Sequence, residues 1–460
     1  MSTMEWSRLL STVRPGQKEQ RPKEGRTDFN TDHDRIIFSS AFRRLQDKTQ
    51  VFPLAETDYV RTRLTHSLEA SNIGRTLGTL TGRRLLAERR ELAECTGNTS
   101  SPISEDDFGA VVATAALAHD IGNPPFGHSG EDAIRQWFAC SATGRKVIDA
   151  LPEDLRADFL HFEGNAQGYR ILSRLQYPDR AYGMRLTCAT QGTFMKYPCE
   201  AGCMNSAHRT YKKYGLFAAE RDMFAQAAAE LGLIRHEDGA SPCVSWARHP
   251  LAYLVEAADD ISYSIADIED GFRRGRVTYD EVFDLLSPFI RTEGDWWRRH
   301  LDAMRHPTER VEFLRAMAIG GLVHSAVDCF MEHEAKLLAG VHLEKGLTRH
   351  MALNAPFATL GKMNFSKVYQ DPQVVEIEAA GFEVMDTLLN AFGGAVFRTL
   401  DGKATARDRT LLKLYPESRH AAADNLYEQM LEVTDFVSGM TDTSAVTLYK
   451  KLSGVTLAKG

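Results

Sequence analysis

The side chains best suited to chemistry in this 460-residue chain are histidines and aspartates set within apolar helical segments. Four of them stand out as metal ligands, namely His66, His119, Asp120 and Asp259. Carboxylates are seldom fully buried unless a partner or a metal compensates them, and here Asp120 follows AVVATAALA and Asp259 follows YLVEAA. Two imidazoles and two carboxylates make a mixed nitrogen and oxygen site. Such a site suits Mn, Fe, Co or Mg better than a metal that prefers thiolates.

A histidine and a glutamate lie just past the double-proline turn at 122–125. His128 and Glu131 are three residues apart, and such a pair can share a proton near neutral pH. We interpret them as a candidate acid/base pair, with a surface hydrogen-bonded pair as the alternative.

The elements that must position these residues are predicted to be mainly helices. Apolar spacing predicts one or two helices over 64–92, an almost wholly apolar helix over 108–119 that begins after Ser104, a helix over 251–272, and several more over 280–460. The best short strand candidates are 187–196 and 244–246. We therefore expect a flexible N-terminal arm (1–34), a catalytic core (35–290) and a helical C-terminal region (291–460) that packs on the core and contributes to oligomer contacts.

Composition excludes several classes of protein. Apolar residues make up 43% and charged residues 25%, as in ordinary globular proteins, and the net charge of −7 gives no general attraction to nucleic acid. Seven scattered cysteines predict reduced thiols, because the Cys199/Cys203 pair lacks the second pair of a zinc ribbon. Residues 1–26 lack the apolar region of a signal peptide, and the longest mainly apolar run, 108–118, is too short to cross a bilayer. We expect a cytoplasmic protein with no membrane partner.

The order His66, His119-Asp120, Asp259 is the signature of the HD superfamily, and five longer segments are more specific. RTRLTHSLE, AHDIGNPPFGHSGE, HFEGNAQGYRIL, EAADDISYSIADIEDG and FVSGMTDTSAV resemble the dGTPase-like branch of deoxynucleotide triphosphohydrolases. The resemblance runs from about residue 30 to the C-terminus. It implies a helical HD-domain bundle that hydrolyses a dNTP to a deoxynucleoside and inorganic triphosphate, while dGTP preference is only the family's label.

The resemblance also assigns roles to residues. It makes His66, His119, Asp120 and Asp259 the ligands of Mn²⁺ or Mg²⁺, with Co²⁺, Fe²⁺ and Ni²⁺ as alternatives. Asp259 is preferred to Asp260 because it lies four residues before a tyrosine and eight before an aspartate that match the family. His128 and Glu131 match the family's acid/base pair. The implied triphosphate contacts are Arg63, His161, Lys196 and Tyr263, and the implied base or sugar contacts are Gln50, Asn165, Tyr197 and Asp267.

The implied mechanism is metal-assisted attack of water on the α-phosphorus. Arg63 and Lys196 would offset charge on the phosphate oxygens, and the His128–Glu131 pair would protonate the departing 5′-oxygen. The family resemblance further implies a homo-oligomer, either a hexamer or another ring built of dimers, an allosteric nucleotide, and weak binding of single-stranded DNA.

Three alternatives stay open on sequence grounds. The first is an HD phosphodiesterase or nucleotidase that acts on a monophosphate or an alarmone, which would release phosphate or pyrophosphate. The second is a regulatory nucleotide-binding protein without turnover, against which the intact ligand and acid/base residues argue. The third is a DNA-binding module. The negative net charge of the chain makes DNA binding a secondary role at most.

Overall fold

The computed structural model describes residues 3–16, 26–50, 61–89, 92, 102–204, 212–236, 243–367, 372–415 and 425–455. Over these residues the chain is mainly α, as predicted, and its two strands form one short antiparallel pair. The elements used below are α1 (Trp6–Leu9), α2 (Asp28–Ile37), α4 (Arg63–Glu88), α6 (Glu105–Ala118), α7 (His128–Cys140), α8 (Ala142–Ala150), α9 (Ala157–Leu160), α10 (Gly164–Arg170), α11 (Cys188–Phe194), α13 (Leu251–Arg273), α14 (Tyr279–Leu286), α15 (Trp296–Ala303), α16 (Pro307–Leu338), α17 (Asn354–Lys367), α18 (Pro372–Leu400), α19 (Ala406–Leu412), α21 (Leu426–Ser438), α22 (Asp442–Leu452), β1 (Arg235–His236) and β2 (Ser245–Trp246).

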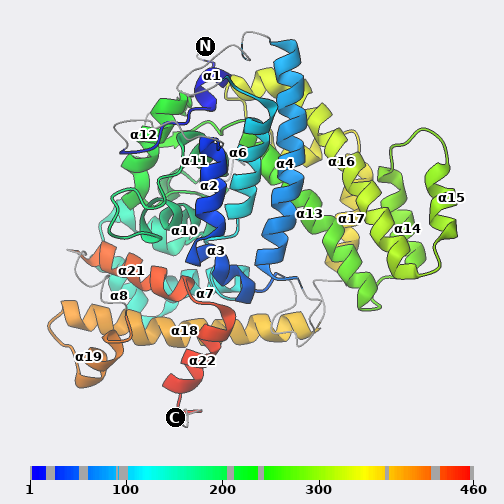
Figure 1. The fold of residues 1–460 in the computed structure, drawn as a ribbon. Coiled ribbons are helices and arrows are strands. Elements are labelled where there is room, and N and C mark those ends of the chain that lie inside the picture. The colour runs from blue at the N-terminus through cyan, green and yellow to red at the C-terminus, as the bar shows by residue number, and fades with distance from the viewer. Residues whose placement is uncertain are drawn as a thin grey trace.

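Helices α4, α6 and α13 pack side by side at the centre (Figure 1). The predicted start of α6 is confirmed, because Ser104 caps it and exchanges hydrogen bonds with Asp107 in a capping box. Every residue of α6 from 108 to 118 is buried, so the helix forms the middle of the core. The two helices α4 and α6 approach closely at Gly78, where a Cβ atom would lie 2.5 Å from the Phe108 carbonyl oxygen. Of the predicted helical segment 64–92, the residues up to Glu88 form one long helix, α4.

The N-terminal segment, which the sequence predicts to be a flexible arm, makes buried contacts with the rest of the chain. In the described residues 3–16 and 26–34, Trp6 is 3% exposed and its indole Nε1 donates a hydrogen bond to Glu334 at 2.7 Å. Arg14 is buried and forms ion pairs with Asp28 and Asp32 on α2. Buried contacts with residues distant in sequence anchor these parts, and the division of the chain at residue 34 stays a prediction.

One of the two predicted strands is a helix. Residues 187–196 contain several threonines and were expected to be extended, but 188–194 form α11, whose N-terminus is capped by the Thr187 side chain. The other strand candidate, 244–246, is confirmed as β2. The helix α11 ends at Phe194, and Lys196 directly follows its C-cap residue, Met195.

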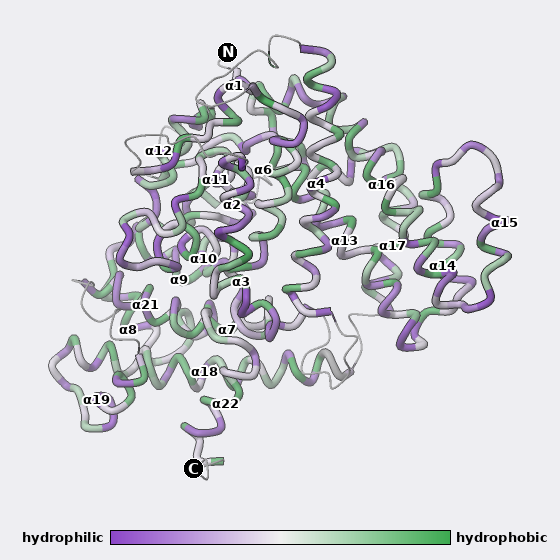
Figure 2. The backbone as a smooth tube through the Cα atoms, in the orientation of Figure 1, coloured by the Kyte–Doolittle hydropathy of each residue, from purple (hydrophilic) through white to green (hydrophobic). Residues whose placement is uncertain are grey.

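Buried apolar side chains form two clusters that cross the predicted domain boundaries. The larger cluster joins residues from α1 to α17, including α15, α16 and α17 beyond residue 290. The second joins α7, α8 and α9 to α18, α19, α21 and α22. Figure 1 shows α18 lying across the bottom of the view, below α7 and α8, and Figure 2 shows hydrophilic residues along α15 at the right-hand edge. The division into 35–290 and 291–460 stays a prediction.

The expectation that all cysteines are reduced is wrong for one pair. Cys203 and Cys243 form a disulfide with their Cα atoms 5.6 Å apart. The pairing has a local cause, since the Glu200 amide donates to the Val244 carbonyl and the Val244 amide donates to the Glu200 carboxylate, which brings the two segments together. Cys140, Cys188, Cys199 and Cys329 are free, and Cys95 lies outside the described residues.

Helix α16 is long and apolar enough to cross a membrane by length and composition alone. The sequence argument, which considered only the run at 108–118, overlooked it. In the described structure 56% of its most apolar window is buried inside the protein, and the core helix of a globular protein passes the same test. The helix packs on α4 and α13 in the larger cluster.

A buried carboxyl in the second cluster predicts how stability depends on pH. Burial raises the pKa of Asp158 to about 7, although its Oδ2 accepts hydrogen bonds from the Tyr427 hydroxyl at 2.6 Å and the Ala218 amide at 2.9 Å. The folded state therefore holds a proton that the unfolded state has lost between about pH 4 and 7, so this group lowers stability as pH rises through that window. In Asp158→Asn the amide oxygen can accept both bonds without ionising. We expect the variant to gain roughly 2–4 kcal/mol over the wild type between pH 5 and 8.

The measurement is urea denaturation of both proteins at pH 5 and pH 8. Asp302→Asn serves as the control, because the Asp302 side chain is 77% exposed. An Asp158→Asn stability curve parallel to that of the wild type would contradict the prediction.

Candidate active site

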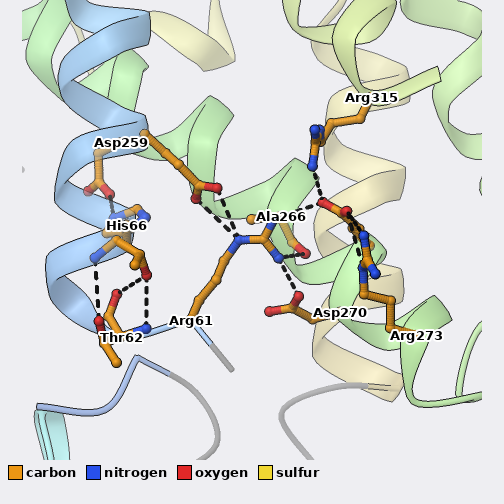
Figure 3. Close-up of polar contacts among 11 residues, drawn as sticks. Arg61, Thr62, His66, Asp259, Ala266, Asp270, Arg273 and Arg315 are labelled. Atoms are coloured by element: carbon orange, nitrogen blue, oxygen red, sulfur yellow. Dashed lines mark hydrogen bonds and ion pairs between the residues drawn. The ribbon is translucent and has the colours of Figure 1, made fainter. Parts of the chain in front are cut away.

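Three of the four predicted metal ligands converge from three helices. His66 lies in the first turn of α4, His119 ends α6, and Asp259 lies in the middle of α13. The Nε2 atoms of His66 and His119 lie 3.0 and 3.4 Å from Asp259 Oδ1. Ligand atoms of all three residues lie within 4.8 Å of one another, which allows them to hold one metal ion. Figure 3 shows His66 and Asp259 facing each other between α4 and α13.

Asp120 stands at the edge of this group. Its Oδ1 lies 3.6 Å from His119 Nε2 and accepts hydrogen bonds from Arg63 Nη1 at 3.0 Å and from the Asn123 amide. Its Oδ2 is buried and has no hydrogen-bond partner among the described residues. A buried carboxylate oxygen without a partner is costly, and a cation beside it would remove that cost. The residues present therefore fit a hard divalent metal.

The buried histidines and carboxylates of the site shift one another's pKa values. Burial lowers the pKa of His119, but Asp120 and Asp259 outweigh it and raise that pKa to about 9. Burial likewise raises the pKa of Asp259, yet His119 and His66 hold it well below its usual range. The two carboxylates thus stabilise the protonated form of His119. A divalent cation bound at this group would displace that proton.

The neighbouring Asp260 has a separate environment. Its Oδ2 accepts a hydrogen bond from the Thr348 hydroxyl at 2.7 Å. Burial, together with the nearby carboxylate of Glu256, raises its pKa to about 7. The geometry thus separates Asp260 from the ligand group around Asp259.

An ion-pair network fixes the start of α4 against α13. Arg61 lies two residues before α4 begins, and its guanidinium contacts Glu269 at 2.7 Å, Glu69 at 3.2 Å and also Asp270 (Figure 3). Arg315 on α16 contacts the same Glu269 at 2.7 Å. Since α4 and α13 carry ligands of the metal group, this network holds the two ligand-bearing helices in register.

A cavity of about 410 Å³ opens beside the metal group. Ten of the predicted site residues line it, and they are Gln50, Arg63, His119, Asp120, His128, Asn165, Lys196, Tyr197, Asp259 and Tyr263. Buried polar atoms without hydrogen-bond partners in the described structure include Gln50 Oε1 and Arg63 Nε at this wall. Such atoms indicate contacts that a polar ligand would complete.

The remaining predicted residues do not line the cavity. His66 and Glu131 are buried behind its wall. His161 is exposed at the end of α9, and Asp267 is buried one turn beyond Tyr263. The assignments of His161 and Asp267 to substrate binding stay predictions.

The candidate acid/base pair is formed. His128 Nδ1 lies 2.9 Å from Glu131 Oε2, and the His128 side chain is 82% exposed whereas that of Glu131 is 2% exposed. Glu131 Oε1 also accepts the Gly164 amide at 2.7 Å. Burial raises the pKa of Glu131, but the hydrogen bond from His128 and the charge of Lys213 outweigh it and lower that pKa. The glutamate therefore stays ionised and can hold the imidazole in one orientation.

Replacing His128 by glutamine tests that role. Glutamine keeps a hydrogen bond toward Glu131 but cannot deliver a proton near neutral pH, so kcat should fall about 10²–10⁴-fold. The measurement is the steady-state rate of nucleotide hydrolysis over a range of pH. His324→Gln, at an exposed position on α16, is the control. Equal rates for the His128 variant and the wild type would exclude His128 as the acid.

Four polar residues of the cavity wall were not predicted from the sequence, namely Asn123, Thr193, Lys213 and Glu256, and Asp260, which was expected to point elsewhere, lines the cavity too. Glu256 Oε1 lies 3.4 Å from Lys196 Nζ, and Lys213 Nζ lies 3.1 Å from Glu163 Oε2. Asn123 and Glu256 lie within motifs already singled out, so their positions were available as a signal. Lys213 lies outside every motif, and nothing in the sequence pointed to it.

Comparisons with known proteins agree with this geometry. The profile of the family described as "HD domain" matches residues 63–180, and that of the "Phosphohydrolase-associated domain" matches 348–451. A deoxyguanosinetriphosphate triphosphohydrolase-like protein of Synechocystis is 42% identical, covering 99% of this chain and all of the relative. A protein of the same name from Pseudomonas aeruginosa is 39% identical over 98% of this chain and 99% of its own length. The deoxyguanosinetriphosphate triphosphohydrolase of Cronobacter sakazakii is 30% identical over 93% of this chain and 94% of its own length.

Proposed function

Because the chain belongs to the deoxyguanosinetriphosphate triphosphohydrolase-like family of HD-domain proteins, we propose that it hydrolyses a deoxynucleoside triphosphate to a deoxynucleoside and inorganic triphosphate. One observation carries the proposal above the others. The cavity is lined both by His119, Asp120 and Asp259 of the metal group and by the cations Arg63, Lys196 and Lys213. That combination suits a polyphosphate placed beside a metal.

Each residue has a defined task in this proposal. His66, His119, Asp120 and Asp259 would hold a divalent cation, Mn²⁺ or Mg²⁺ first, and it would supply Lewis acidity toward a phosphoryl oxygen. Co²⁺, Fe²⁺ and Ni²⁺ are the other candidates that the mixed donor set accepts.

The chain's own groups would do the rest. Arg63 and Lys196 compensate the negative charge of the phosphate tail, and Tyr263, which lines the same cavity, contacts the phosphates as well. His128, held by Glu131, gives its proton to the departing 5′-oxygen. Gln50, Asn165 and Tyr197 also line the cavity, and we propose that they contact the sugar and base.

Chromatography of the products from each of the four dNTPs, with Mn²⁺, Mg²⁺ and Co²⁺ in turn, tests the proposal. Inorganic triphosphate together with a deoxynucleoside supports it, and the relative rates give the base preference. Recovery of orthophosphate or pyrophosphate alone would favour an HD phosphodiesterase or nucleotidase. Binding of dNTP without turnover under any metal would favour a regulatory protein.

Assembly and regulation are proposed on the family resemblance alone. We propose a cytoplasmic homo-oligomer, a hexamer or another ring of dimers, with an activating nucleotide and weak binding of single-stranded DNA as further partners. Light scattering measures the first, and rates with a second nucleotide or with DNA measure the others.

A further inference from the structure

The carboxylate of Asp442 joins the C-terminal region to both loops that flank the cavity. Asp442 is the first residue of α22 and is 1% exposed. Its Oδ2 accepts hydrogen bonds from the Thr49 amide at 3.0 Å and the Thr49 hydroxyl at 2.7 Å. Its Oδ1 accepts the Phe126 amide at 3.0 Å. One buried side chain thus holds segments that lie 393 and 316 residues away in sequence.

Both partners of Asp442 stand next to residues of the candidate site. Thr49 precedes Gln50 and pairs in a β-bridge with Thr62, which in turn precedes Arg63. Phe126 lies two residues before His128. Asp442 therefore hydrogen-bonds to one residue that is adjacent in sequence to Gln50 and to another that lies two residues before His128.

The turn at Phe126 needs support from outside itself. Phe126 has φ 62°, in the left-handed region that residues with a side chain rarely adopt, and Gly127 follows with φ 58°. Together the two residues turn the chain into α7, so their conformation sets the direction of His128. The hydrogen bond from the Phe126 amide to Asp442 fixes the first of these two residues.

Two further contacts from the C-terminal region meet the same turn. Lys48 Nζ donates hydrogen bonds to the Asn123 carbonyl and, at 2.9 Å, to the Ser438 carbonyl at the end of α21. A Cβ atom at Gly381 on α18 would lie 2.8 Å from the Phe126 ring, so the ring lies against the helix backbone there. Yet no described residue from 348–451 lines the cavity.

We propose that Asp442 is a positioning residue, through which the phosphohydrolase-associated region sets the geometry of His128 and Gln50 without touching the substrate. The proposal rests on the proposed function for the chemistry that it affects, but the structural coupling does not depend on which nucleotide is cut. In this proposal the phosphohydrolase-associated region positions residues of the active site through Asp442.

Asp442→Asn is the first test. The amide keeps the shape of the carboxylate but has one acceptor oxygen, so the bond to Thr49 or the bond to Phe126 is lost. We expect kcat to fall about 10–100-fold, as a small misplacement of a catalytic group does. Mn²⁺ affinity should change by less than about threefold, because Asp442 hydrogen-bonds to Thr49 and Phe126 and not to the metal ligands, whereas KM should rise if the bond to Thr49 is the one lost.

Asp408→Asn is the matched control. Asp408 is also 1% exposed, belongs to the associated region, and accepts hydrogen bonds from the Thr405 amide and hydroxyl at the start of α19. It has no contact with the cavity loops, so its replacement should leave kcat unchanged even if it lowers the melting temperature. Equal losses of kcat in both variants would mean a general structural role and would overturn the proposal.

Hydrogen exchange gives a readout that needs no substrate. Asp442→Asn should speed amide exchange in a peptide spanning 122–132, while Asp408→Asn should not. Unchanged exchange in that peptide overturns the proposal. If the wild type cuts no dNTP, the proposed function fails, but the exchange result still decides the coupling.

Thr49→Val keeps the test decisive if Asp442→Asn does not fold. It removes only the hydroxyl bond at 2.7 Å and leaves the Phe126 bond intact. The variant should raise KM more than it lowers kcat, because it loosens the loop of Gln50 rather than the turn of His128. A fall in kcat with unchanged KM would contradict this division of roles.

Discussion

Asp259→Asn should lower nucleotide hydrolysis by about 10³-fold or more and should empty the metal site. Asp259 Oδ1 lies within 3.4 Å of both His66 and His119, so it supplies the charge that the whole ligand group shares. A neutral amide of the same shape keeps the packing of α13 but removes the negative charge that a hard divalent cation requires. Steady-state rates, metal content of the purified protein and circular dichroism together measure the effect.

Asp260→Asn is the matched comparison, one residue along the same helix. Its carboxylate bonds to Thr348 rather than to the histidines, so we expect its metal content to match that of the wild type. Retention of metal by the Asp259 variant together with loss of metal from the Asp260 variant would show that the assignment of the ligand is reversed.

Arg170→Met should destabilise the protein by about 3–5 kcal/mol. The Arg170 guanidinium is buried, and it contacts Glu220 at 2.6 Å and Asp435 at 2.9 Å, whose side chains are at most 1% exposed. Methionine fills similar space but leaves two buried carboxylates without their shared cation. Since Asp435 lies on α21, the loss also weakens the attachment of the C-terminal helices to α10.

Denaturant unfolding of Arg170→Met and of Arg83→Met separates buried from exposed ion pairs. Arg83 pairs with Glu105 on the surface, where its side chain is 60% exposed, so its replacement should shift the midpoint far less. Similar midpoints for the two variants would mean that the buried network contributes no more than a surface pair.

Helical periodicity predicts the ligand-bearing helices, whereas most of the cavity wall is predicted only by the family resemblance. Helical periodicity and the apolar run before Asp120 carry the information on these helices locally, because a wholly buried helix can end in polar residues only where they have partners. Tyr263 follows Asp259 by one helical turn, so its place on the same wall also follows from spacing.

Contacts between distant segments could not be predicted in this way. The helix at 188–194 was expected as a strand, since threonines favour strands until one of them, Thr187, caps a helix. The Cys203–Cys243 disulfide depends on the pairing of two loops, and the anchoring of Arg14 depends on Asp32 in a later helix. Lys213 and Asp442 reach the site only through tertiary structure.

The cations of the cavity wall are already neutralised before any ligand arrives. Arg63 contacts Asp120 at 3.0 Å, Lys196 contacts Glu256 at 3.4 Å, and Lys213 contacts Glu163 at 3.1 Å. Entry of a nucleotide is therefore an exchange of counter-ions, in which phosphate oxygens displace carboxylates from their basic partners. A small monovalent anion gains little from such an exchange, whereas a chain of linked phosphates can meet several basic groups at once. We therefore expect the resting pocket to discriminate by the number of linked charges before it contacts any base.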